Sequence, residues 1–254
     1  MPDLDSKPTL RVAALADLHH SRDSQASLVP MLTQIGKDAD VLLLCGDLTH
    51  HGLPEEASAL VRELSTLRIP VLAVLGNHDH HSDQQEEIKK VLADSSIRLL
   101  DGDAVEIGGV GFAGVKGFAS GFGRRTLEPW GESLIKQFVR EAVDESLKLE
   151  SALARLRTER RVAVLHYAPI AQTVEGEPLE IYPFLGSSRL EEPLNRFQVM
   201  AAFHGHAHHG APEGRTSTGV PVYNVSIPLL RQLHPDRPPF RLVELETGGA
   251  TDHA

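Results

Sequence analysis

The sequence has few of the features that mark secreted, membrane-bound or nucleic-acid-binding proteins. Its single cysteine, Cys45, excludes an intrachain disulfide and a thiolate-rich metal site. No apolar run is long enough to span a membrane, and the first ten residues carry neither the basic nor the apolar segment of a secretory signal. We therefore expect a cytoplasmic protein that does not enter the membrane.

Positive charge is also scarce. The 254 residues include 25 Lys and Arg against 35 Asp and Glu, which gives a formal net charge of −10. Because no run of five consecutive basic residues occurs, the sequence argues against long nucleic acid as a partner. The length and the 41% hydrophobic content fit a single domain over residues 1–254.

Short apolar runs rich in Val and Leu alternate with helical patterns in the first third of the chain. The runs cover residues 9–15, 39–45 and 69–75, and each ends at a turn that contains Gly or Asp. Between them, residues 24–37 and 53–67 repeat apolar side chains three and four positions apart. This alternation predicts an α/β layered fold.

The pattern changes after residue 94. Short runs separated by turn residues predict antiparallel additions to a sheet rather than further crossover units; they cover 97–100, 103–107 and 109–115. From 132 to 158 an apolar stripe among charges predicts a long outer helix, with a dimerisation or lid role as the alternative. Four more strand candidates follow, at 159–169, 198–210, 219–226 and 240–246.

Side chains that can bind metal follow five of the predicted strands. Loops after the carboxyl ends of strands in an α/β sheet converge on one crevice, so we expect these side chains to meet there. They are, in chain order, Asp17 and His19, then Asp47, then Asn77, His78 and Asp79, then His166, and finally His206 and His208.

Turn formation alone does not explain these clusters. Gly, Asp or Asn serves after any strand, but His recurring with Asp or Asn at all five ends needs another reason. In an extended segment alternate side chains point the same way, so Asp-x-His and His-x-His can each reach one ion. Oxygen and imidazole ligands without sulfur favour Mn, Fe, Zn or similar divalent metals in a catalytic type of site.

The blocks D-x-H, G-D, G-N-H-D, H and G-H-x-H occur in the order in which they define the calcineurin-like metallophosphoesterases, and the chain resembles that family from Asp17 to His208. The resemblance implies a four-layer αββα sandwich with mixed β-sheets and an active site at the C-terminal ends of the strands. It also implies two divalent metal ions. One would be held by Asp17, His19 and His208, the second by Asn77, His166 and His206, and Asp47 would bridge both.

The chemistry that follows is hydrolysis of a phosphate ester. Two ions would lower the pKa of a shared water to near neutral and present a bridging hydroxide for in-line attack. His78 would protonate the leaving oxygen or stabilise the transition state, with Asp79 fixing its tautomer and orientation. The charge of the ions would make the pocket attractive to phosphate although the protein is acidic.

The second block narrows the substrate. Protein Ser/Thr phosphatases of this superfamily carry Asp-Arg soon after it, whereas this chain reads GDLTHHG, which argues against that activity. The GDLT and GNHD forms resemble small bacterial phosphodiesterases, so a small phosphodiester, nucleotides included, is slightly favoured. The alternatives are a phosphomonoesterase acting on a small molecule or nucleotide and a non-catalytic metal-binding scaffold. The complete ligand set favours the enzyme, and a homo-oligomer is compatible with the sequence.

Substrate contacts are harder to infer. Residues 114–130 predict a long loop over the crevice, in which Arg124 and Arg125 would pair with phosphate and Phe122 or Trp130 would stack on a base; a solvated surface loop is the alternative. Residues 224–240 form a second candidate segment. Additional histidines beside the motifs are expected to be polar residues at the rim, with a hydrogen bond to a ligand or contact with substrate as the alternative; they are His20, His50, His51, His80 and His81. His204 is expected deeper along its strand, and His209 either away from the ions or in support of a ligand.

Overall fold

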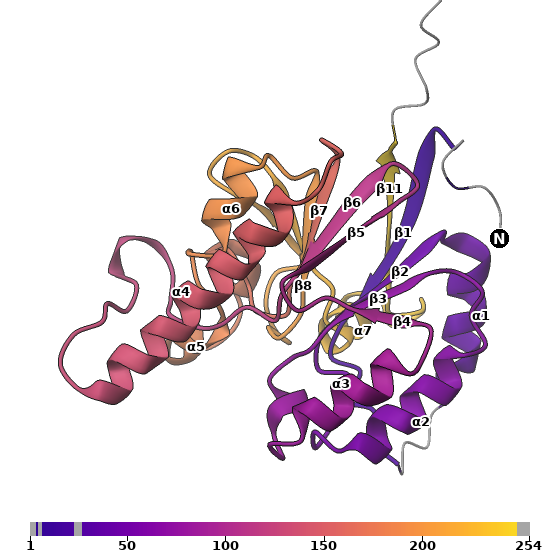
Figure 1. Ribbon diagram of the computed structural model, residues 1–254, viewed down its shortest axis with the longest axis horizontal. Helices are drawn as coiled ribbons and strands as arrows, with labels where there is room; N and C mark the ends of the chain where they lie inside the picture. The colour runs from indigo at the N-terminus through magenta and orange to yellow at the C-terminus, as the bar shows by residue number, and fades with distance from the viewer. Residues whose placement is uncertain (1–3, 5–6, 23–26, 248–254) are drawn as a thin grey trace, which may run out of the picture.

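Two mixed β-sheets pack face to face with helices on both outer faces (Figure 1). The computed structural model describes residues 4, 7–22 and 27–247. Its layers confirm the expected α/β class and the four-layer αββα arrangement. The assignment of residues 1–254 to a single domain stays a prediction.

The first sheet has the strand order β11-β1-β2-β3-β4. Its parallel strands are β1 (Thr9–Leu15), β2 (Val41–Cys45), β3 (Val71–Val74) and β4 (Ile97–Leu99), with β11 (Arg241–Glu246) antiparallel to β1. The helices that connect them cover one face: α1 (Val29–Asp38), α2 (Pro54–Leu64) and α3 (Gln85–Ala93). The expected start of the first helix at residues 24–26 lies outside the described residues.

The expected antiparallel addition after residue 94 is wrong for β4. This strand pairs in parallel with β3 because α3 connects the two strands and brings the chain back to the end of the sheet at which β3 begins. The next two runs do form an antiparallel hairpin, β5 (Asp103–Ile107) and β6 (Val110–Gly114), but they belong to the second sheet.

The second sheet has the order β5-β6-β7-β8-β10-β9. β6, β7 (Arg161–Val164), β8 (Ala201–His204) and β10 (Pro221–Asn224) run parallel, and β5 and β9 (Glu213–Arg215) are antiparallel edges. The predicted long helix is confirmed as α4 (Ser133–Ala154) on the outer face with α6 (Glu191–Arg196). The shorter elements are α5 (Tyr182–Leu185), α7 (Ile227–Leu233) and four 3-10 turns, η1 (His78–His80), η2 (Gly123–Arg125), η3 (Ala171–Val174) and η4 (Leu179–Ile181).

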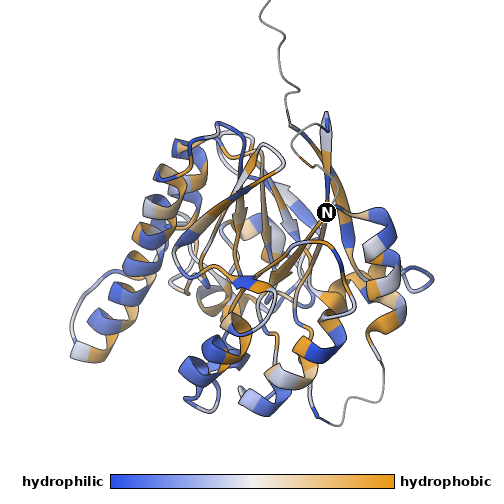
Figure 2. Ribbon diagram, turned by 45° about the vertical axis from the view of Figure 1, so that its right-hand side comes forward, coloured by the Kyte–Doolittle hydropathy of each residue, from blue (hydrophilic) through white to orange (hydrophobic). Residues whose placement is uncertain are grey.

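Alternate strand residues supply the separate cores between the layers. In β1, Val12 and Ala14 pack against the second sheet, whereas Ala13 and Leu15 pack against the helices of the first. Figure 2 shows the apolar residues gathered on the strands between the helical layers. Each fully buried Val or Leu stabilises the fold by about 1.5–3 kcal/mol. Cys45 is fully buried in the inter-sheet core, as its pattern predicts.

No helix among the described residues is both long and apolar enough to cross a membrane. The longest, α4, is charged along its exposed side (Figure 2). Its C-terminal half packs on the second sheet through Leu149 and Leu153, while its first turns, residues 133–137, are exposed.

Candidate metal centre

The structure brings the seven predicted metal ligands together from five strand ends. The ligand atoms of Asp17, His19 and His208 lie within 4.8 Å of one another, and so do those of Asp47, His166 and His206. The remaining residue, Asn77, joins the second group, because its Oδ1 lies 2.8 Å from His166 Nε2. Residues separated by up to 191 positions therefore form two adjoining groups, in the division implied by the resemblance.

Asp47 lies between the two groups. One carboxylate oxygen, Oδ1, is 3.3 Å from His166 Nε2, and the other, Oδ2, is 3.8 Å from His19 Nε2. The main-chain N–H of His78 donates to Oδ1 at 2.8 Å and holds the carboxylate in this position. A carboxylate that presents one oxygen to each group is placed to bridge two cations.

The backbone at these positions is strained. Six described residues other than glycine have φ in the left-handed region, and four of them belong to the predicted ligand set: Asp17 (59°), His19 (43°), Asp47 (49°) and His206 (71°). Such conformations cost about 1–2 kcal/mol for an L-residue, and they concentrate at functional sites.

Close packing around the carboxylates explains two glycines of the motifs. A Cβ at Gly76 would lie 2.1 Å from Asp47 Oδ1, and one at Gly205 would lie 2.7 Å from Asp17 Oδ2. Only a residue without a side chain leaves room for these acids. The sequence contains this signal in the G-N and G-H pairs, although we assigned no site role to either glycine.

The donor set around His166 fits a cation. Burial lowers the pKa of His166 well below its ordinary value, so the ring is neutral and carries one N–H. Its Nδ1 donates to the Cys45 carbonyl oxygen at 3.0 Å. Nε2 is then an unprotonated acceptor that faces two further acceptors, Asn77 Oδ1 and Asp47 Oδ1. A positive ion between them would relieve this repulsion.

The pKa shifts of Asp47 and His208 also fit a site that binds cations. Burial, followed by the nearby charges of Asp17 and Asp79, raises the pKa of Asp47 well above its ordinary value. The hydrogen bond to Asp17, whose oxygen is 3.5 Å away, raises the pKa of His208. Bound divalent cations would stabilise both carboxylates in their charged form, which is the form that binds metal.

His206 is oriented by a main-chain oxygen that the sequence did not reveal. Its Nε2 donates to the Phe184 carbonyl of α5 at 3.2 Å, which leaves Nδ1 to face the metal group. Its own N–H donates to Asp17 at 3.0 Å. The carbonyls of Cys45 and Phe184 therefore select the ring nitrogens that face the centre, and a carbonyl has no side-chain signature in a sequence.

The expected contact between Asp79 and His78 is wrong. The buried Asp79 carboxylate accepts from the main-chain N–H groups of Leu48, Thr49 and Gly76, at 3.2, 2.8 and 2.8 Å, and from the Thr49 hydroxyl at 2.6 Å. Its oxygens are occupied in joining the second and third strand ends. His78 Nδ1 instead lies 2.8 Å from the His50 carbonyl oxygen, and its ring lies 4.3 Å from that of His19.

The additional histidines divide into supporting and peripheral residues. His204 is fully buried at the end of β8, where Nε2 bonds the Thr173 hydroxyl at 2.8 Å and burial lowers its pKa to about 4. His209 is exposed. The other five lie around the first three strand ends. His20 lies beside Glu63, and His51 hydrogen-bonds Glu56. The rings of His50 and His81 lie near that of His78, and His80 lines an adjoining pocket.

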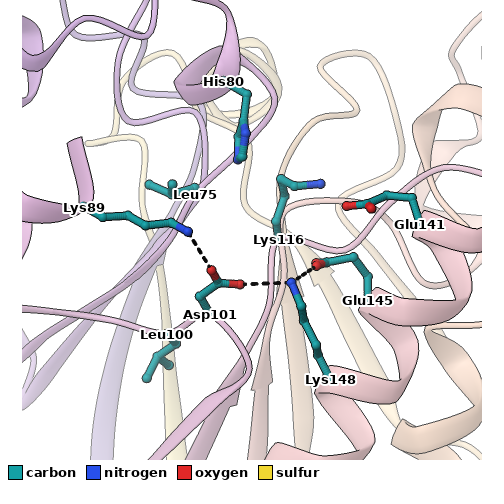
Figure 3. A pocket seen from close by; sticks show the side chains of 9 residues that line it. All are labelled: Leu75, His80, Lys89, Leu100, Asp101, Lys116, Glu141, Glu145 and Lys148. Atoms are coloured by element: carbon teal, nitrogen blue, oxygen red, sulfur yellow. Dashed lines mark hydrogen bonds and ion pairs between the residues drawn. The ribbon is translucent and has the colours of Figure 1, made fainter. Parts of the chain in front are cut away.

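That pocket, of about 100 Å³, is lined by none of the seven predicted ligands; Figure 3 shows the nine residues that line it. Within the pocket, Asp101 pairs with Lys89 at 2.9 Å and with Lys148 at 3.4 Å, so the charges of these three side chains largely compensate one another. Lys116 points into the pocket, and its main-chain oxygen accepts from His166 N–H at 3.0 Å. The pocket therefore adjoins the metal centre through the backbone of Lys116.

The predicted substrate residues have no contact with the predicted ligands among those found for the described residues. Arg124 and Arg125 are exposed in η2, and their role stays a prediction. Gly123 N–H donates to the Ser188 hydroxyl at 2.9 Å, which holds this loop near α5. Phe122 packs against the small core around Leu185, and Trp130 is 73% exposed.

The second candidate segment, 224–240, has a structural role at its start. Ala16 N–H donates to Val225 O at 2.9 Å, and Ile227 N–H donates to Ala16 O at 3.0 Å. These bonds hold the residue that precedes Asp17. Residues 231–238 are exposed.

Known proteins share this sequence pattern and fold. Two curated relatives are each named a probable cyclic nucleotide phosphodiesterase. One, from Vesicomyosocius okutanii, is 27% identical over 68% of this chain, and the other, from Moraxella catarrhalis, is 34% identical over 31%. The chain matches 64% and 31%, respectively, of the lengths of these relatives.

Structural comparison gives the same fold. The phosphopantetheinyl hydrolase of Mycobacterium tuberculosis superposes with a TM-score of 0.67 at 14% identity, covering 94% of this chain and 96% of that one. The family model described as calcineurin-like phosphoesterase matches residues 10–210, which include all seven predicted ligands. The resemblance noted in the sequence is therefore confirmed, and the chain belongs to the calcineurin-like phosphoesterase family.

Proposed function

We propose that this protein is a phosphoric ester hydrolase that uses two divalent metal ions, of the Mn, Fe or Zn type, to cleave a small phosphodiester. The observation that carries the proposal is the position of Asp47, whose two oxygens face the two ligand groups at 3.3 and 3.8 Å. The names of the two curated relatives support a diester, nucleotides included, over a monoester. A cytoplasmic location and a homo-oligomer stay predictions.

The residues of the two groups would hold the ions, with Asp17, His19 and His208 around one and Asn77, His166 and His206 around the other. When bound, such a pair lowers the pKa of water and neutralises the charge of a phosphoryl group. The buried positions of Asp17 and Asp47 exclude bulk water from one side of the site and strengthen its electrostatics.

His78 would be the proton donor. Its Nδ1–H donates to the His50 carbonyl, so Nε2 is the atom that can give a proton to a leaving oxygen. The side chain is half-buried beside His19, at the entrance to the centre rather than in either ligand group. His78 would therefore act on the substrate and not on metal retention.

A metal-by-substrate panel tests the proposal. The protein is stripped with a chelator, reloaded separately with Mn²⁺, Fe²⁺ or Zn²⁺, and assayed on bis(p-nitrophenyl) phosphate, p-nitrophenyl phosphate, and 2′,3′- and 3′,5′-cyclic AMP. We expect turnover that disappears on chelation, returns with metal and favours the diesters. Preference for the monoester would make the protein a phosphomonoesterase, and full metal loading without turnover of any ester would make it a scaffold.

A further inference from the structure

Aromatic residues make up only 5% of the chain, yet four of them form a continuous row beside the metal centre. The ring centroids of Phe184 and Phe138 are 6.3 Å apart, those of Phe138 and Phe118 are 4.9 Å apart, and those of Phe118 and Tyr167 are 5.8 Å apart. The four rings come from α5, α4 and the segments that follow β6 and β7. We call this set the aromatic row.

Both ends of the aromatic row meet the same predicted metal ligand. The Tyr167 ring lies 4.5 Å from the His206 ring, and the Phe184 carbonyl accepts from His206 Nε2 at 3.2 Å. The row is therefore anchored to the second ligand group at both ends. At one end the contact with His206 is made by the Tyr167 ring, and at the other by the main chain of Phe184.

Phe184 is the open member of the row. Its side chain is 56% exposed, whereas Phe118 and Phe138 are partly buried and Tyr167 is 7% exposed. The ring of Phe138 packs against Phe184 at 80°, which supports the exposed ring from one side and leaves another side free.

The backing of Phe184 is rigid. Ala168 N–H donates to Leu185 O at 3.1 Å, and Ser120 N–H donates to Gly186 O at 3.0 Å, so α5 is fixed to the segments after both β7 and β6. Behind it, the Lys116 ammonium lies 4.8 Å from the Phe118 ring centroid and 5.4 Å from that of Tyr167. A preorganised ring loses little entropy when a ligand stacks on it.

We propose that Phe184 is the stacking platform for the nucleobase of a nucleoside phosphate whose phosphate lies at the metal centre. This inference rests on the proposed function and names the part of the substrate that gives specificity. The occupant follows from the site: one open ring next to a phosphate-binding centre suits a planar ring joined to phosphate by a sugar. Stacking of a base on an aromatic side chain contributes about 1–3 kcal/mol.

Binding of AMP and of ribose 5-phosphate isolates the base, because ribose 5-phosphate carries a hydroxyl at C1 where AMP carries adenine. Isothermal titration of the Mn²⁺-loaded protein should give a Kd for AMP at least about tenfold lower than that for ribose 5-phosphate. In Phe184→Ala the ratio of the Kd for ribose 5-phosphate to the Kd for AMP should fall to near one. In Phe184→Leu, which keeps apolar area without a π face, this ratio should fall most of the way to one. Phe184→Trp should restore it.

Leu147→Ala is the matched control, because Leu147 is 54% exposed on α4 and is not part of the aromatic row. It should keep the wild-type ratio. An equal ratio in wild type and Phe184→Ala would overturn the platform, and so would failure of the wild type to prefer AMP. Turnover of bis(p-nitrophenyl) phosphate by the same samples separates the two ideas: turnover with an unchanged ratio rejects only the platform, and full metal loading without turnover of any ester rejects the hydrolase.

Discussion

The Nδ1 atom of His78 lies 2.8 Å from the carbonyl oxygen of His50, three residues after Asp47. This contact connects the second and third strand ends at the entrance to the metal centre. Because a carbonyl only accepts, Nδ1 is the donor in this contact, and Nε2 is left as the ring nitrogen that can exchange a proton with a substrate. The orientation that the sequence attributed to Asp79 is supplied by the backbone.

Replacement of His78 by Ala should separate chemistry from metal binding. His78 shares a candidate group with His19 and His50 but lies outside the two groups that contain Asp17 and Asp47. The variant should therefore keep both ions, while kcat on a diester falls by about 10²-fold or more. Metal analysis of the purified protein and steady-state kinetics measure the two quantities. His81→Ala, an exposed neighbour, is the control, and loss of metal from the His78 variant would show that it is a ligand.

Replacement of Asp79 by Asn should mainly destabilise the fold. The carboxylate accepts four hydrogen bonds in a fully buried position, and an amide places an N–H₂ group where two of those donors point. We expect a loss of about 2–3 kcal/mol in the free energy of unfolding. Urea denaturation of the metal-free protein measures it. Unchanged stability together with a loss of kcat equal to that of His78→Ala would restore the role that the sequence suggested.

Asp47 and Asp17 should differ in how much metal they retain. Asp17→Ala removes a residue from one group and should leave the group around His166 able to bind, whereas Asp47→Ala removes the carboxylate that faces both. The Asp47 variant should therefore bind less metal than the Asp17 variant and show no turnover. Isothermal titration with Mn²⁺ compares them. Equal metal content in the two variants, or turnover by Asp47→Ala, would contradict the bridging position.

The predictable part of this protein is the part encoded by side-chain pattern. Apolar runs located β1, β2 and β3, and the Asp-x-His and His-x-His spacings located side chains that the fold does bring together. The division into two groups came from the family resemblance. Strand ends converge in an α/β fold whatever the loops between them, so the centre could be anticipated without knowing the loops.

The unpredicted part depends on groups without a pattern. α3 is only nine residues long and begins at Gln85, shortly after the third block, so it was not expected, and without it the parallel pairing of β4 could not be foreseen. The carbonyls of Cys45, His50 and Phe184 orient three histidines, but main-chain atoms are common to all residues. The left-handed turns at Asp17 and Asp47 were equally invisible, because Asp is rare but tolerated there.

Gly76 should tolerate no side chain. A Cβ would lie 2.1 Å from Asp47 Oδ1 and 2.8 Å from His166 Cε1, so Gly76→Ala must displace the group that contains both residues. We expect weaker metal binding and a drop in kcat. Gly36→Ala in α1 is the control, since its backbone is not left-handed and a Cβ there meets only the Leu67 side chain, at 3.4 Å. Wild-type metal affinity in Gly76→Ala would show that the packing around Asp47 is looser than the distances indicate.

Asp40 lies at the end of β2 opposite the metal centre, and it should make the free energy of unfolding depend on pH. Burial alone would raise its pKa, but hydrogen bonds from Arg11 and Lys7 outweigh it and lower the pKa to about 2 from 3.8. A lowered pKa stabilises the fold above pH 3.8, and this contribution is lost as the pH falls towards 2.

Asp40→Asn should therefore lower the free energy of unfolding by about 1–2 kcal/mol at pH 7, after allowance for the solvent exposure of both cations. The difference from wild type should shrink at pH 3, where the wild-type carboxylate has begun to lose its advantage. Urea denaturation at the two pH values measures it, with Asp103→Asn as an exposed control. If the difference in the free energy of unfolding between wild type and Asp40→Asn grew as the pH fell, the charge of Asp40 would oppose folding. Only a group whose pKa is raised in the folded state contributes more stability in acid.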